Sequence, residues 1–418
     1  MSTLLFITSA YPYYPGEQFI ETEIQFLAKS FEEIYVLPLD GDTNQTHRPL
    51  PPNVFLADDV RAFRNRHKRN PISRAVGFCR TLGAVFKEIK ARKFLFAKNP
   101  KAFFPLLRIA SGAGQITPLI ARLVSEKRPV LIYSYWLTMG TLAAALALDK
   151  MQLNIPLVSR IHGFDLYEER HTTHYCPFQA LMLSRLTALI PISRDGENYL
   201  KKKYHERIPK NLKTFRLGVL PNRKSQMSPD ETLRIVSCSS LTPVKRVNLL
   251  IEALALLDFP ILWNHIGDGP LRGHLEAQAK NLAKTKKNIT TVFLGQISNQ
   301  EVLSFYENNP VDVFINVSSS EGIPVSIMEA MSRGIPAIAT AVGGTPEIVD
   351  EDLGAGFLLP QDVTPEEIKQ KINIFYRLSQ TERGKMRDKA FLKWFNDFNA
   401  EKNYREFADF LEQLSCQR

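Results

Sequence analysis

The chain has 418 residues, of which 44% are hydrophobic, and its formal net charge is +10. At roughly 100 to 200 residues per domain, this length is too great for one hydrophobic core and suits two. No stretch approaches the roughly 18 apolar residues that a membrane-spanning helix requires. The short apolar run Leu4–Ile7 lacks the basic lead of a secretion signal. We therefore expect a two-domain protein without a signal peptide or a membrane span.

In the first half of the chain, short apolar runs alternate with helical stretches. The predicted strands are Leu4–Ser9, Ile34–Leu39, Val130–Ser134, Pro156–Arg160 and Ala188–Ile192. Strands that alternate with helices predict βαβ units, and therefore a parallel sheet with helices on both faces.

A basic segment separates the second and third of these strands. Positions 61 to 108 hold 14 lysines or arginines and one acid, Glu88, so this segment accounts for the whole positive surplus. Phenylalanines alternate with the basic residues, as in amphipathic helices that lie on anionic membranes. We expect a helical insertion at about 57–125 that binds an anionic membrane surface through 61–108. The alternatives are a solvated structural subdomain and nucleic-acid binding, for which no known module is present.

The second half shows the same alternation, and more regularly. Its predicted strands are Leu233–Cys238, Ile261–Ile266, Thr290–Leu294, Val311–Val317 and Pro336–Thr340. We expect an α/β protein with two Rossmann-like, doubly wound domains, at 1–222 and 223–390, that face each other across a cleft. The aromatic, amphipathic tail at 391–418 is predicted to be one helix that packs across the domains.

The cysteines and histidines indicate neither a disulfide nor a metal site. The four cysteines are far apart and form no C-x-x-C pair, which suits a reducing cytoplasm. His171 and His174 have a spacing found in metal sites, but no third ligand is evident. The D-x-D pattern at 40–42 follows Pro38 in a polar loop, where a turn is expected. The G-x-G pattern at Gly267 lacks the third glycine of a dinucleotide motif, because Arg272 stands there.

The strongest functional signal is the sequence SEGIPVSIMEAM at 320–331. It follows a predicted strand and opens a helix near 324–333, so unpaired backbone N–H groups and the positive end of the helix dipole face the cleft. Gly322 leaves room for a phosphate, and Pro324 suits the first helical turn. The spacing of Glu321 and Glu329 is common by chance, but in this context they can accept hydrogen bonds from different hydroxyls of one extended ligand.

Further motifs accompany this one along the chain. They are Gly16-Glu17, Arg160–Asp165, Leu217–Val219, Gly267–Leu271, Phe293–Gly295, Gly334–Pro336, Gly343–Ile348 and Gly356–Leu358. Together they resemble glycosyltransferase family 4, whose members are retaining, metal-independent enzymes of the GT-B fold. The likeness spans nearly the whole chain and is strongest at about 235–359.

The resemblance implies a donor site in the second half. Glu329 would bind the ribose hydroxyls of the nucleotide, and Glu321 would hold the donor sugar as a catalytic residue. Lys245 would neutralise the diphosphate as the glycosidic bond breaks. The other implied donor-binding residues are Arg246, Gly322, Ile323, Pro324 and Gly267.

The resemblance implies an acceptor or phosphate loop in the first half, formed by Gly16, Glu17 and Asp165. His162, at the end of a predicted buried strand, would donate a hydrogen bond to the transferred sugar and is the second predicted catalytic residue. The chain departs from the family pattern at Ser239-Ser240, where glycine and a phosphate-binding arginine are usual. Arg246, where glycine is usual, is the candidate to compensate for the missing arginine, and the sequence leaves that question open.

The function we expect is transfer of a sugar from a nucleoside diphosphate sugar to a saccharide or polyprenyl-linked acceptor, with retention and without a cofactor or metal. By analogy the product is a capsule, exopolysaccharide or O-antigen. The enzyme would work in the cytoplasm or on the inner face of the cell membrane, with no nucleic-acid partner. Two alternatives are another enzyme of this architecture, such as a phosphorylase or nucleotide-sugar epimerase, and a non-catalytic nucleotide-sugar-binding protein.

Overall fold

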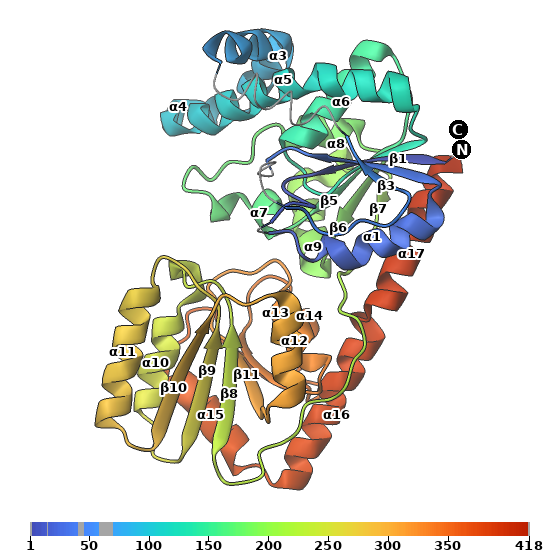
Figure 1. The fold of residues 1–418 in the computed structure, drawn as a ribbon. Coiled ribbons are helices and arrows are strands. Elements are labelled where there is room, and N and C mark those ends of the chain that lie inside the picture. Colours follow the sequence, from blue (N-terminus) through green and yellow to red (C-terminus); the bar gives the residue numbers. More distant parts are fainter. Residues whose placement is uncertain (1, 15, 41–45, 58–69, 417–418) are drawn as a thin grey trace. The chain divides into compact units, whose positions relative to one another are not determined.

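The structure is a computed structural model that describes residues 2–14, 16–40, 46–57 and 70–416 (Figure 1). The chain divides into two compact units, which are Met1–Phe215 with Tyr404–Arg418 (unit 1) and Arg216–Asn403 (unit 2). The sequence prediction places the corresponding boundaries at 222 and 390. Each unit contains one parallel sheet, which confirms the predicted α/β class.

The sheet of unit 1 has the strand order β3-β2-β1-β4-β5-β6-β7, and all of its strand pairs are parallel. The strands are β1 Thr3–Thr8, β2 Glu33–Pro38, β3 Val54–Leu56, β4 Leu131–Ser134, β5 Leu157–Ile161, β6 Ala188–Pro191 and β7 Asn211–Leu212. The five predicted strands lie within one residue of their expected bounds. The sequence did not predict β3 and β7, because strands this short show no alternation.

Helices cover both faces of this sheet. They are α1 Ile20–Ser30, α3 Pro71–Ala91, α4 Lys93–Lys98, α5 Phe103–Lys127, α6 Met139–Met151, α7 Gly163–Leu166, α8 Gln179–Arg185 and α9 Arg194–Tyr204, with 3₁₀ turns η1 Pro100–Ala102, η2 Glu168–Arg170 and η3 His205–Arg207. Successive residues of β1 point to opposite faces. Leu5 and Ile7 join the core beneath α5 and α6, whereas Leu4 and Phe6 join the core that includes α1 and the end of the chain.

The insertion consists of α3, α4 and α5. Asn70 begins α3 by accepting hydrogen bonds from the amides of Ile72 and Ser73, at 2.9 and 3.3 Å. The helices α3 and α5 cross at two glycines, and a Cβ atom on Gly114 would lie 1.8 Å from the carbonyl oxygen of Gly77. Residues 61–69, which belong to the segment predicted to bind a membrane, lie outside the described residues. None of the described helices combines the length and hydropathy needed to cross a bilayer.

A fully buried ion pair holds unit 1 together behind its sheet. The Arg160 guanidinium on β5 lies 2.8 Å from the Glu23 carboxylate on α1, and it also donates to the Tyr133 hydroxyl and to the Phe215 carbonyl, each at 2.9 Å. Burial raises the pKa of Glu23, while Arg160 opposes that rise. Removing one partner of such a pair leaves an uncompensated buried charge, at a cost of about 3–5 kcal/mol.

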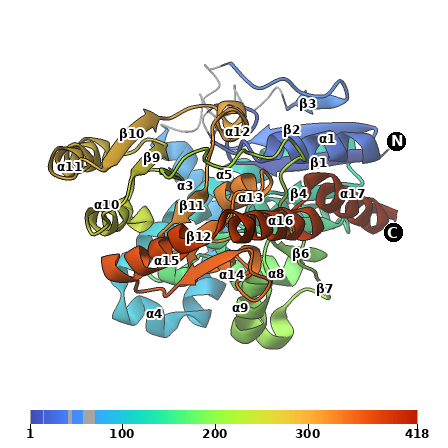
Figure 2. The ribbon, with the colours of Figure 1, turned by 90° about the horizontal axis from the view of Figure 1, so that it is seen from below.

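The sheet of unit 2 has the order β10-β9-β8-β11-β12-β13 and is also parallel. The strands are β8 Leu233–Cys238, β9 Ile261–Ile266, β10 Ile289–Gly295, β11 Val313–Asn316, β12 Ala337–Thr340 and β13 Gly356–Leu359. The helices are α10 Val247–Ala255, α11 Arg272–Thr285, α12 Asn299–Asn308, α13 Val325–Met331, α14 Thr345–Ile348, α15 Pro365–Arg377 and α16 Gln380–Asp397, with the 3₁₀ turn η4 Pro243–Lys245. In Figure 2, α10, α11 and α15 cover one face of this sheet, and α12, α13 and α16 the other.

The end of the chain forms two helices, not the single helix predicted at 391–418. Helix α16 ends at Asp397, and α17 runs from Ala400 to Cys416. Phe398 leaves the helical conformation, and the Asn399 side chain then accepts a hydrogen bond from the Glu401 amide at 3.0 Å. An asparagine in this role starts a new helix. The division between the units falls inside α17, whose Phe407 packs in unit 1 against Tyr133 and Phe215.

Candidate active site

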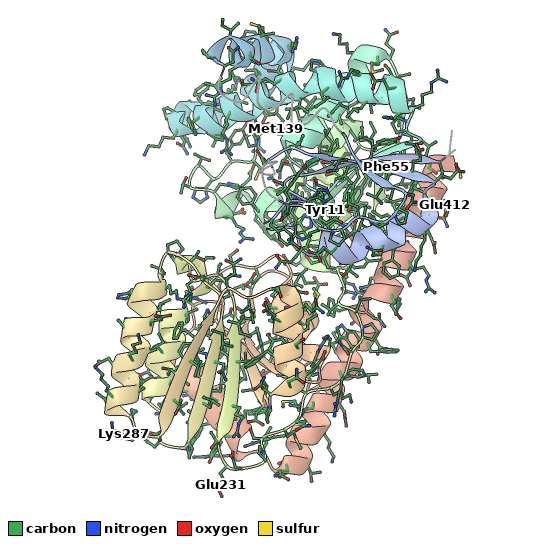
Figure 3. The ribbon with its side chains drawn as sticks, in the orientation of Figure 1. Tyr11, Phe55, Met139, Glu231, Lys287 and Glu412 are labelled. Atoms are coloured by element: carbon green, nitrogen blue, oxygen red, sulfur yellow. The ribbon has the colours of Figure 1, made fainter. Side chains whose placement is uncertain are left out.

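The predicted donor residues lie at the carboxyl edge of the unit 2 sheet. Lys245 closes η4 after β8, Gly267 follows β9, and Glu321 lies in the loop between β11 and α13. The direction of chain connection reverses between β8 and β11, and such switch points are where open α/β sheets bind ligands. Glu231 and Lys287, labelled in Figure 3, precede β8 and β10 and mark the opposite edge.

An ion pair joins two of these loops. The Lys245 ammonium lies 2.6 Å from Oε1 of Glu321, and the Asn316 side-chain amide donates to the same oxygen at 3.3 Å. Asn316 is the last residue of β11, and its own Oδ1 accepts from the Ser318 amide at 3.0 Å. The cation and the carboxylate therefore lie together at the edge of the sheet, and Asn316 positions the carboxylate.

Glu329 is buried on α13. Its Oε1 accepts a hydrogen bond from the Asn299 side chain on α12 at 2.5 Å, and no hydrogen bond to its Oε2 is found within the described residues. Burial raises the pKa of Glu329 to about 7, opposed by the Asn299 hydrogen bond and the positive charge of Arg333. At neutral pH this group therefore exchanges between a carboxylate and a carboxylic acid.

The loop before α13 presents free backbone amides. The helix begins at Val325, so Gly322–Pro324 precede it rather than open it as predicted. The amides of Gly322 and Ile323 have no acceptor within the described parts of the chain. The loop rests on Gly343, which has a φ of +52° and whose added Cβ atom would lie 2.1 Å from the Glu321 carbonyl oxygen.

Gly267 has a comparable role one strand away. Its φ is +135°, a conformation that other residues rarely adopt, and a Cβ atom there would lie 2.0 Å from the Ser239 carbonyl oxygen. The Gly267 amide donates to the Gly295 carbonyl at 2.8 Å. Gly267 therefore lets the loops after β8, β9 and β10 pack together, and its contribution to a donor site is structural.

Arg246, the candidate to compensate for the missing arginine, is held by backbone carbonyls. Its guanidinium donates to the carbonyls of Val317, Ser318 and Gln361, at 2.8, 3.1 and 2.9 Å. Arg246 has a φ of +47° at the start of α10, and this conformation directs it to the neighbouring loops. Ser240 is exposed and carries only a hydroxyl, so Lys245 is the cation that the edge offers at this point.

In unit 1, Glu17 organises the loop after β1. Its carboxylate accepts hydrogen bonds from the amides of Ser9, Ala10 and Tyr11, at 3.0, 2.5 and 2.5 Å. The Trp136 indole N–H donates to the same group at 2.5 Å. Four donors already occupy this carboxylate, so Glu17 holds the loop in shape rather than presenting a free charge to a phosphate. Beside it, Gly16 is exposed and needs glycine for its φ of +99° rather than for space.

His162 lies at the end of β5 within an aromatic cluster. Its ring centroid is 4.3 Å from that of Trp136 and 4.8 Å from that of Tyr135. Both ring nitrogens are buried without a hydrogen-bond partner in the described chain. Burial, reinforced by the charge of Arg160, places the pKa of His162 well below its usual value. The imidazole is therefore neutral at physiological pH.

Asp165 joins the loops after β4 and β5. Its carboxylate accepts from the amides of His162 and Leu137, each at 2.6 Å. Burial raises the pKa of Asp165 to about 7, although these hydrogen bonds oppose the rise. The group is buried and satisfied by the backbone, so it positions His162 and is not placed to bind a phosphate.

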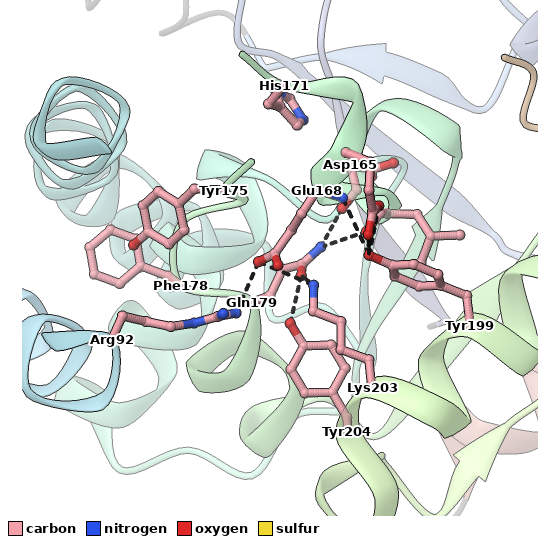
Figure 4. A network of polar contacts seen from close by, with 12 residues as sticks. Arg92, Asp165, Glu168, His171, Tyr175, Phe178, Gln179, Tyr199, Lys203 and Tyr204 are labelled. Atoms are coloured by element: carbon pink, nitrogen blue, oxygen red, sulfur yellow. Dashed lines mark hydrogen bonds and ion pairs between the residues drawn. The ribbon is translucent and has the colours of Figure 1, made fainter. Parts of the chain in front are cut away.

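A polar network links this loop to the insertion (Figure 4). Glu168 accepts from Arg92 at 2.9 Å and from Lys203 at 3.1 Å. The side-chain oxygen of Gln179 accepts a hydrogen bond from Lys203 at 2.9 Å, and its side-chain nitrogen donates to the Asp165 carbonyl at 2.6 Å. The chain between α7 and α9 thereby contacts the insertion at Arg92, which stands between α3 and α4. His171 instead contacts the Phe164 carbonyl through Nε2, at 2.7 Å.

The sequence prediction missed Asn299, Asn316 and Trp136. Ser298 and Glu301 form a capping box at the start of α12, and Asn299 stands directly after Ser298. The sequence therefore indicates that Asn299 begins a helix, but it gives no sign of the contact with Glu329. Asn316 and Trp136 stand at or just beyond strand ends, a position that favours function in parallel sheets.

The chain resembles known proteins in sequence and in fold. Residues 220–392 match the family model for glycosyl transferases group 1. Two relatives carry the name putative colanic acid biosynthesis glycosyltransferase WcaL. The WcaL protein of Escherichia coli K12 is 28% identical to this chain, over 60% of this chain and 63% of that protein. The WcaL protein of Salmonella typhimurium is 23% identical to this chain, over 96% of this chain and 97% of that protein. Anabaena HepE, solved with UDP and glucose, superposes with a TM-score of 0.66 at 18% identity, over 99% of this chain and 100% of that one.

The chain is a glycosyltransferase of the GT-B fold. The resemblance inferred from the motifs at 320–358 is thus confirmed at the level of fold and enzyme class. Placement of the glycosyltransferase in family 4 stays a prediction, as do its site residues.

We expect Gly267→Ala to destabilise unit 2 of the glycosyltransferase by about 1–3 kcal/mol, because the added methyl group forces both a strained φ and a clash with Ser239. Gly273→Ala is the matched control, since a Cβ atom there meets nothing within 4 Å and Gly273 lies in α11. Urea denaturation should show a lower midpoint for the first variant and an equal or higher one for the second. Equal midpoints would show that the loops after β8 and β9 need no close approach.

Proposed function

We propose that the enzyme transfers a sugar from a nucleoside diphosphate sugar to a saccharide or polyprenyl-linked acceptor, with retention of the anomeric configuration, in the synthesis of a surface polysaccharide. The observation that carries the donor assignment is the grouping of Lys245, the free amides of Gly322 and Ile323, and the half-satisfied carboxylate of Glu329 on one sheet edge. The named relatives in colanic acid synthesis and the UDP complex of HepE support the substrate class.

Each group at that edge suits one part of the donor. Lys245 and the amides of Gly322 and Ile323 stabilise the negative charge that develops on the diphosphate as the glycosidic bond breaks. The Glu321 carboxylate accepts hydrogen bonds from the donor sugar, and Lys245 moves from that carboxylate toward the phosphate. Glu329 receives the ribose hydroxyls on its Oε2, while Asn299 fixes its other oxygen.

His162, a residue of unit 1, is proposed to contact the transferred sugar. Because its imidazole is neutral at physiological pH, it carries one N–H donor and one acceptor nitrogen. A buried imidazole without hydrogen bonds is unfavourable, and a sugar hydroxyl would relieve that cost. Retention is proposed from the resemblance to family 4.

Nucleotide binding should depend on pH through Glu329. A carboxylate accepts two hydroxyl hydrogen bonds better than an acid does, so with a pKa of about 7 the affinity for UDP should rise about tenfold between about pH 6 and pH 8. Calorimetric titration with UDP measures this rise. Glu329→Gln should bind about 10- to 100-fold more weakly and lose this part of the pH dependence. Because the ionisation of UDP itself is common to both proteins, an equal pH dependence would disprove the assignment.

Turnover should separate transfer from the alternatives. We expect Glu321→Gln and His162→Ala to reduce sugar transfer by at least about 100-fold while UDP affinity changes by less than about fivefold. Glu351→Gln, an exposed loop carboxylate, is the matched control and should behave as the parent does. Nucleotide release from UDP-sugars that requires an acceptor identifies transfer. Nucleotide release that requires inorganic phosphate would favour the phosphorylase alternative. No nucleotide release from any UDP-sugar that binds would favour the binding-protein alternative.

We also propose that the insertion lies on an anionic membrane, where a polyprenyl-linked acceptor would be found. The only acid at 70–125 is Glu88, and it is buried against the Tyr175 hydroxyl and the Phe178 amide. The exposed charges of this segment are therefore all positive. Large apolar side chains stand exposed among them, including Phe94 at 72% and Phe104 at 74%. On α3, Ile72, Val76 and Phe86 share one exposed face.

Sedimentation with phosphatidylglycerol vesicles tests the membrane proposal. The variant Phe94→Ser with Phe104→Ser should lose most binding, because both rings would otherwise enter the interface. Lys98→Gln with Lys101→Gln should weaken binding more at low salt than at high salt. Phe395→Ser is the control, since that ring is also exposed, at 49%, on α16 in unit 2. Equal binding by all these proteins, or equal binding to neutral phosphatidylcholine vesicles, would contradict the proposal.

A further inference from the structure

Three aromatic residues follow three neighbouring strands of unit 1. Tyr14 lies in the loop after β1, Trp136 stands two residues after β4, and Phe164 stands three residues after β5. Since β1, β4 and β5 are adjacent and parallel, all three residues belong to the same carboxyl edge. Tyr14 and Phe164 are 46% and 57% exposed, Trp136 is partly exposed, and neither Tyr14 nor Phe164 belongs to a hydrophobic core.

These rings are exposed but held in place. The Tyr14 ring lies 4.1 Å from the guanidinium carbon of Arg48, which is itself buried and donates to the Tyr13 carbonyl at 3.0 Å. The Phe164 ring meets the edge of the His171 ring at 4.8 Å. A surface ring that is already fixed loses little conformational freedom on binding a ligand.

Glu17 joins the Trp136 ring to the loop that carries Tyr14. Its carboxylate ties the Trp136 indole N–H to the backbone amides at the start of the loop that carries Tyr14. The indole also packs on His162, whose ring nitrogens are buried and without partners within the described residues. Aromatic faces and an unsatisfied imidazole therefore adjoin each other at this edge.

We infer that Tyr14, Trp136 and Phe164 form a platform for the pyranose rings of the acceptor saccharide, with Glu17 as its positioning residue. A pyranose presents an apolar C–H face, which packs on aromatic rings, and a rim of hydroxyls, which needs polar partners such as His162. Separate, rigid rings on three loops suit successive sugar units of one chain. This inference rests on the proposed function, because it gives the acceptor site of that reaction its chemical class.

Intrinsic fluorescence tests the platform directly. The protein has three tryptophans, and Trp263 and Trp394 are fully buried, so Trp136 reports on ligands at the surface. Lactose, cellobiose and maltose are the probes. We expect at least one to change the emission saturably, and the change to be absent from Trp136→Phe. Phe164→Leu and Tyr14→Leu should each raise the dissociation constant of that probe about tenfold, equivalent to about 1.4 kcal/mol.

Phe55→Leu is the matched control, because that ring is exposed on β3 of the same sheet away from this edge, and it should leave the dissociation constant unchanged. Emission that none of the probes alters, a change that persists in Trp136→Phe, or equal dissociation constants in Phe164→Leu and the parent would each overturn the platform. Calorimetric titration of the same proteins with UDP keeps the two proposals apart. Saccharide binding without UDP binding would defeat the proposed donor site, and UDP binding without saccharide binding would defeat only the platform.

Discussion

The contact between Lys245 and Glu321 joins the loops that follow β8 and β11, the two strands at which the chain connection reverses in unit 2. Both partners are largely shielded from water, where an ion pair is screened less than at the surface. Each charge stabilises the other at a place where either alone would be costly. A diphosphate that takes the ammonium releases the carboxylate for sugar hydroxyls, so one pair can serve both parts of a donor.

The loops can converge on this pair only because glycine stands at the points of closest approach. Gly343 lies under the Glu321 carbonyl and Gly267 lies against the Ser239 carbonyl, each at a distance that admits no side chain. In this packing the amides of Gly322 and Ile323 have no acceptors among the residues that the structure describes. The free hydrogen-bonding capacity of the edge is thus a product of close backbone packing, not of an extended loop.

The two units use their carboxyl edges differently. In unit 2 the edge offers a cation, amides and a carboxylate with a pKa near neutrality, which suit a charged and hydroxyl-bearing ligand. In unit 1 the carboxylates of Glu17 and Asp165 accept hydrogen bonds from backbone amides and, for Glu17, also from the Trp136 indole. Exposed aromatic side chains, Tyr14 and Phe164, stand at the same edge. This contrast supports a phosphate-bearing donor in unit 2 and a neutral saccharide in unit 1, as a transferase requires.

The two parallel sheets and the bounds of the longer strands were predictable from the sequence, because burial on both faces gives continuous apolar runs. The enzyme class was predictable from the family resemblance that the glycine-containing motifs carry. The sequence also placed Lys245, Glu321 and Glu329 on the correct loops and helix. The directions and contacts of these side chains became clear from the folded chain alone. Arg246 turns to three carbonyls, Glu17 and Asp165 bind backbone amides, and Asn299 reaches Glu329 across 30 positions of sequence, because hydrogen bonds between loops depend on a convergence in space that no local pattern encodes.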